Sequence, residues 1–83
     1  MKEYKEMIHT YHESISLLKS RIDELNEKIR THKGDSQEAL GSLVDRRYKL
    51  YQEVWELQGD IRMMGEYIEA VEERNLQKTL AIA

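Results

Sequence analysis

The residues best suited to metal chemistry lie near the N-terminus, where a carboxylate and two histidines are closely spaced. Glu6, His9 and His12 stand three residues apart, and residues at this spacing share one face of a helix. Carboxylate and imidazole groups arranged in this way bind metals in helical bundles. The chain has no second Glu-x-x-His element, and its heptad pattern places Glu6 and His9 toward solvent. We therefore expect a pair of surface histidines, with no metal and no cofactor.

Catalysis by a side-chain nucleophile has little support in the sequence. The chain contains no cysteine, and its serines fall on polar helix faces or in the predicted turn, away from a paired base. It also lacks a glycine-rich loop that could bind a phosphate. We expect no catalytic residues and predict that the protein is not an enzyme.

Arg47 is an unusual residue because it occupies a position that the surrounding pattern reserves for apolar side chains. One interpretation is functional, in which its guanidinium group holds an acidic partner or substrate. The other is structural: Arg47 pairs with an acid across a helix interface and so fixes the register, or extends its charged end to water. We favour the structural interpretation.

The composition indicates one small helical domain. The chain has 83 residues, of which 35% are charged and 40% hydrophobic, with no proline and a net charge of −3. Dense charge together with many apolar residues is typical of helices that are solvated on one face and buried on the other. A net negative charge does not favour direct binding to nucleic acid. We find no signal peptide and no membrane span, and we expect a cytoplasmic location.

The first half of the chain carries an apolar heptad repeat. Its apolar residues recur at alternating steps of four and three, a spacing that keeps one side of a helix facing a partner helix. The repeat predicts a helix over residues 3–32. Its members are Tyr4, Ile8, Tyr11, Ile15, Leu18, Ile22, Leu25 and Ile29.

A turn is predicted at residues 33–35, where the repeat stops. Gly34 can adopt the left-handed conformation that ends many helices. Asp35, with Glu38 three residues later, forms a capping box for a second helix, and Ser36 is the competing cap. A connection this short makes the two helices antiparallel neighbours.

The second half repeats the pattern and predicts a helix over residues 36–74, followed by a frayed tail at 75–83. Nine of its ten seam positions are apolar, and Arg47 is the exception. These positions are Leu40, Leu43, Arg47, Leu50, Val54, Leu57, Ile61, Met64, Ile68 and Val71. The whole chain, residues 1–83, is thus predicted to be a single all-α antiparallel coiled-coil hairpin of two helices.

Two features predict that the hairpin dimerises into a helical bundle. The second helix is longer than the first, so it should overhang it, leaving Ile68 and Val71 uncovered. It also carries a second apolar stripe at steps of four, three and four. We expect this stripe, with the flanking Arg47, to be a dimer interface or a partner-binding surface. The predicted site residues are Val44, Arg47, Tyr48, Tyr51 and Trp55.

The segment Leu43-Val44-Asp45-Arg46-Arg47, which follows a helix and a short turn and leads into heptads, carries a family resemblance. This arrangement resembles the N-terminal helical pair of small phage-encoded, sigma-factor-like transcription regulators of Firmicutes. The resemblance implies a transcription accessory role. In that family a helix-turn-helix follows the pair and binds DNA, and this sequence has no such segment, so the DNA-binding role is not carried over.

The function predicted from these patterns is a non-enzymatic helical module that binds another protein. It would act as a small regulator, adaptor or inhibitor through one helix face. The expected partners are a protein of unknown identity and a second copy of the chain. The alternatives are a self-assembling structural bundle and a phage-type transcription accessory protein.

Overall fold

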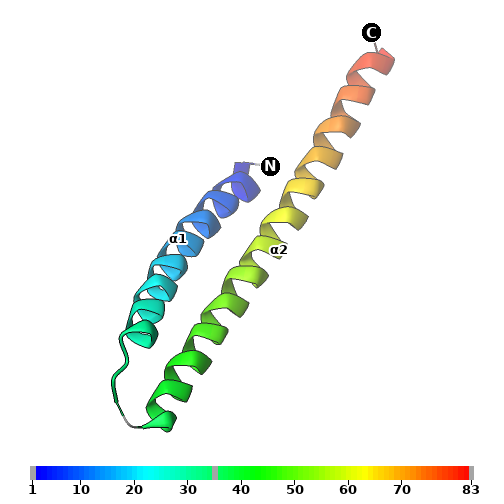
Figure 1. Cartoon of the computed structure of the whole chain (residues 1–83). Coiled ribbons are helices and arrows are strands. Elements are labelled where there is room, and N and C mark those ends of the chain that lie inside the picture. The colour runs from blue at the N-terminus through cyan, green and yellow to red at the C-terminus, as the bar shows by residue number, and fades with distance from the viewer. Residues whose placement is uncertain (1, 35, 83) are drawn as a thin grey trace.

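The computed structural model describes residues 2–34 and 36–82, with side chains described up to Leu80. It contains two helices, α1 (Lys2–Arg30) and α2 (Gln37–Ile82), and no strand within those residues. The helices lie side by side as an antiparallel hairpin, with the N-terminus beside the upper half of α2 (Figure 1). The predicted all-α two-helix hairpin is therefore confirmed. No helix in the described part of the chain is long and apolar enough to cross a membrane.

The heptad repeat forms the seam between the helices, because it keeps apolar side chains on the facing sides of both. Every predicted seam residue except Tyr4, which is 39% exposed, is buried or half-buried. The side chains with the least exposure are Ile15, Leu18, Ile22, Leu25, Val54 and Ile68. Even so, no described side chain is less than 2% exposed, which reflects the small core that two helices can enclose.

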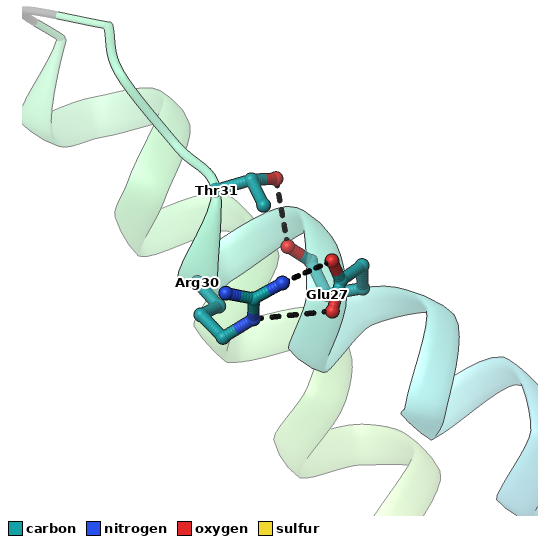
Figure 2. A network of polar contacts seen from close by, with 3 residues as sticks. All are labelled: Glu27, Arg30 and Thr31. Carbon is teal, nitrogen blue, oxygen red and sulfur yellow. Dashed lines mark hydrogen bonds and ion pairs between the residues drawn. The ribbon is translucent and has the colours of Figure 1, made fainter.

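The end of α1 differs from the prediction. Helix α1 ends at Arg30, and no described glycine, including Gly34, has a positive φ. Two of the last carbonyls, those of Glu27 and Ile29, are instead satisfied within the chain. The Thr31 hydroxyl donates to the Glu27 carbonyl oxygen at 2.8 Å, and the His32 amide donates to Ile29 at 3.3 Å. Figure 2 shows Thr31 over Glu27, with Arg30 in a two-pronged contact with the Glu27 carboxylate. With these groups in place, a left-handed glycine is not needed.

Helix α2 begins with a serine cap. The Ser36 hydroxyl oxygen accepts a hydrogen bond from the Ala39 amide at 3.2 Å, which is the position that an N-cap side chain serves. Ser36, the competing cap in the sequence, therefore fills this role. The predicted capping box relies on Asp35, which lies outside the described residues.

The far end of α2 also differs from the prediction. The helix continues to Ile82 instead of ending at residue 74. Residues 75–82 contain neither glycine nor proline and are mostly good helix formers, so nothing in them terminates the helix. The Thr79 hydroxyl donates to the Asn75 carbonyl oxygen at 3.0 Å in this last part.

The overhang begins further along α2 than expected. Ile68 is 8% exposed and Val71 is half-buried, because α1 covers both. Tyr4 contacts Tyr67 edge to face with ring centroids 5.4 Å apart, and Lys5 pairs with Glu72 at 3.0 Å. The prediction of an uncovered Ile68 and Val71 was wrong because it assumed a tight turn.

The connection between the helices explains this shift. Residues 31–34 and 36 are not helical, and the connection carries the chain past the end of α1 before α2 begins (Figure 1). The first turn of α2 therefore lies beyond the end of α1, so each α2 residue meets α1 nearer the α1 C-terminus than a tight turn would place it, and Ile68 and Val71 still face α1. The overhang at the other end begins after Glu72, and it includes the exposed side chains of Leu76 and Leu80.

Candidate interaction surface on α2

The second apolar stripe of α2 lies in solvent, on a side of the helix that α1 does not cover. We call Val44, Tyr48, Tyr51 and Trp55 the aromatic stripe. Tyr48 and Trp55 are each 56% exposed, Val44 is 37% and Tyr51 is 36% exposed. Spacings of four, three and four align these residues along one face. Helix α2 therefore has two apolar faces, the seam that packs on α1 and the aromatic stripe.

The three aromatic rings of the stripe pack on one another. Tyr51 and Trp55 are stacked, with centroids 6.0 Å apart and an interplanar angle of 22°. Tyr48 meets Trp55 edge to face at 6.5 Å and 83°. Contacts of this kind hold aromatic rings in place, so the stripe is a continuous surface of ordered side chains.

Charged residues are absent from a wide band around the stripe. Each residue of an α-helix turns by about 100°. Within roughly 60° of the centre of the stripe, α2 presents only uncharged residues from Gln37 to Gly59, and the charged Arg62 is the next residue on this face. We call this uncharged band the neutral face; besides the stripe it contains Gln37, Leu40, Gly41, Gln58 and Gly59. Seven charged residues occur in the same stretch, and all lie outside this band. In a chain with 35% charged residues, such a band is a distinct surface.

Arg47 faces α1 and is separate from the stripe. Its guanidinium Nη1 donates to the Asn26 side-chain oxygen at 2.9 Å, and the contact is partly buried. The structural interpretation offered an acid or water as the partner, and the partner is the Asn26 amide instead. The register places Asn26 opposite Arg47, which sequence reasoning could not supply. The predicted site thus divides into four residues that lie together in solvent and one that joins the two helices.

The histidines near the N-terminus form a local contact. His9 Nε2 lies 2.7 Å from a carboxylate oxygen of Glu13, one turn away, and both side chains are mostly exposed. The hollow beside them is lined by exposed residues of α1 alone, including Glu6 and Thr10. Among the described residues, no three histidine or acidic side chains are grouped to hold a metal ion.

A groove on the other side of the hairpin carries three basic residues that sequence reasoning did not single out. Arg21 and Lys28 of α1 lie beside Arg46 of α2, with Glu24 at the edge. None of the three forms an ion pair within the described part of the chain. All four charged residues are exposed, so the groove lacks the enclosure of a small-molecule site.

The chain was also compared with known proteins. No family model, curated protein or solved structure matches it.

Proposed function

We propose that the protein is a non-enzymatic helical interaction module that binds another protein through the neutral face of α2. The supporting observation is the aromatic stripe, in which a tryptophan and a tyrosine are each 56% exposed on one ordered surface. Exposed apolar patches of this kind mark contact surfaces in small proteins. Tryptophan and tyrosine also dominate the binding energy of protein interfaces. A role as a regulator, adaptor or inhibitor in the cytoplasm is consistent with such a surface.

The experiment is a comparison of three tagged chains in an extract of the native cells. The wild-type chain and Trp55→Ala differ at the tryptophan of the stripe. Leu17→Ala is the matched control, because Leu17 is 65% exposed on α1 and lies outside the stripe. We expect the wild-type chain and Leu17→Ala to retain the same associated protein, whether a foreign protein or an untagged copy of the chain. Trp55→Ala should lose it.

The helix content of all three chains should be equal in circular dichroism, since neither residue belongs to the seam. Equal retention by the wild-type chain and Trp55→Ala would contradict the proposal, because binding would then use another surface. Retention of nothing by the wild-type chain, native copies included, would also contradict it.

A further inference from the structure

We infer that the occupant of the neutral face is a second copy of this chain, bound antiparallel through a two-fold axis near the middle of the stripe. This inference depends on the proposed function, since it names the partner of the same surface. Three observations support it: the large exposed area of the hairpin, the absence of charge on the face, and the symmetric spacing of its residues.

The first observation is the exposed area. The chain exposes 6868 Å², whereas a compact protein of 9.9 kDa exposes roughly 5,200 Å². The difference, roughly 1,700 Å², is larger than the ~800 Å² that each partner buries in a stable interface of standard size. The hairpin is 73 Å long but only 16 Å and 15 Å across. A second hairpin alongside it supplies the missing layer and gives a four-helix bundle.

The second observation is the neutrality of the face. A partner of opposite charge would be matched by a charged surface, whereas this face presents no charge between Gln37 and Gly59. A symmetric dimer places the same surface on both sides of the interface, so a face with a net charge of one sign would meet a face of the same sign. An uncharged apolar face avoids this repulsion and is therefore suited to self-association.

The third observation is the spacing of the stripe, which reads the same in both directions. A two-fold axis at the level of Lys49 and Leu50 places Val44 against the partner's Trp55, so that a small side chain meets the largest one. The same axis places Tyr48 against the partner's Tyr51.

The symmetry extends beyond the stripe to Leu40, which would meet the partner's Gly59. A Cβ atom built on Gly59 finds nothing within 4 Å in the single chain. The space beside this glycine is therefore open to the leucine of a second copy.

The first test is sedimentation equilibrium on the purified chain without other proteins. We expect a species of twice 9.9 kDa at micromolar concentration. Trp55→Ala should weaken the dimer at least about tenfold, as truncation of a central interface tryptophan does. Tyr48→Glu, which adds a charge to the neutral face, should do the same. Leu17→Ala should leave the dimer unchanged, because its position is 65% exposed on the opposite helix.

The second test determines the orientation by disulfide formation, since the chain has no cysteine of its own. Gln37 and Arg62 flank the stripe on the same face, and the proposed axis brings each close to the other on the partner. In the proposed dimer, the two copies of Gln37 are about 37 Å apart along the helix axis, and so are the two copies of Arg62. These separations are too long for a disulfide. A mixture of Gln37→Cys and Arg62→Cys chains should therefore form the mixed disulfide, and neither variant should link to itself.

The outcomes separate this inference from the proposed function. A dimer with self-linked Gln37→Cys chains would overturn the antiparallel arrangement. A 9.9 kDa species at all accessible concentrations would overturn the second copy as occupant. If the extract experiment still retained a foreign protein through Trp55, the proposed function would stand without this inference; if it retained nothing, both would fail.

Discussion

At the scale of single residues, the contact between Arg47 and Asn26 is the most specific link between the helices. The guanidinium and amide groups are 2.9 Å apart and partly buried. A polar pair at a seam position stabilises only one register, because a shifted helix would bury the arginine without an acceptor. The pair therefore contributes more to alignment than to the net free energy of folding.

Replacement of Asn26 by Ala should lower the free energy of unfolding by about 1–2 kcal/mol, because Arg47 then loses its acceptor in a partly buried site. In an Arg47→Met background the same replacement should cost much less, since no donor is left unpaired. Urea unfolding of the four chains of this double-mutant cycle measures the difference. Equal costs in both backgrounds would show that the hydrogen bond between Arg47 and Asn26 does not stabilise this arrangement of the helices.

At the scale of elements, the start of α2 depends on one side chain. Ser36→Ala removes the hydroxyl oxygen that accepts from the Ala39 amide, and loss of an N-cap typically costs ~1 kcal/mol. Ser42→Ala is the control, because Ser42 is an exposed residue inside the same helix and should have little effect or stabilise slightly. Thermal unfolding compares the two. If both variants behave alike, the cap contributes little and α2 starts through its packing alone.

The interior of α2 contains a glycine whose replacement should stabilise the helix. A Cβ atom at Gly65 finds nothing within 4 Å, so Gly65→Ala introduces no clash. Alanine loses less backbone freedom on folding than glycine does, and the gain should be roughly 0.5–1 kcal/mol. The reverse change at an exposed position of the same helix, Ala70→Gly, should cost a similar amount in urea unfolding. A loss of stability in Gly65→Ala would indicate a close neighbour at this position, such as a second chain.

At the scale of the whole molecule, periodicity predicted the hairpin and its seam but not its alignment. Seam residues such as Ile22 and Val54 follow from a local repeat, and their burial needs no knowledge of the connection. The relative position of the helices depends on the path of residues 31–36, which no periodicity describes. For this reason the sequence did not predict that α1 covers Ile68 or that Arg47 pairs with the Asn26 amide.

The candidate surface was predictable for a related reason. Tyr48 and Trp55 lie on a face of α2 that no plausible shift of α1 along the seam would cover, so their exposure does not depend on the alignment of the helices. Arg47 is one position away in the sequence and belongs to the seam, where alignment decides its contacts. Sequence reasoning could therefore find the stripe but could not assign Arg47 to one side or the other.

A two-chain bundle couples folding to association, and this coupling has a thermal signature. In a dimer that unfolds to single chains, a tenfold rise in concentration stabilises the folded state by about 1.4 kcal/mol. For a folded unit of two such chains, the melting temperature should rise by roughly 3–5 °C per tenfold. Leu17→Ala should keep this dependence. Trp55→Ala should melt at a lower temperature than the wild-type chain at each concentration, because its weaker dimer stabilises the folded state less. A wild-type melting temperature that ignores concentration would mean that the seam between α1 and α2 supports the fold by itself, and the stripe would then contribute nothing to stability in the isolated protein.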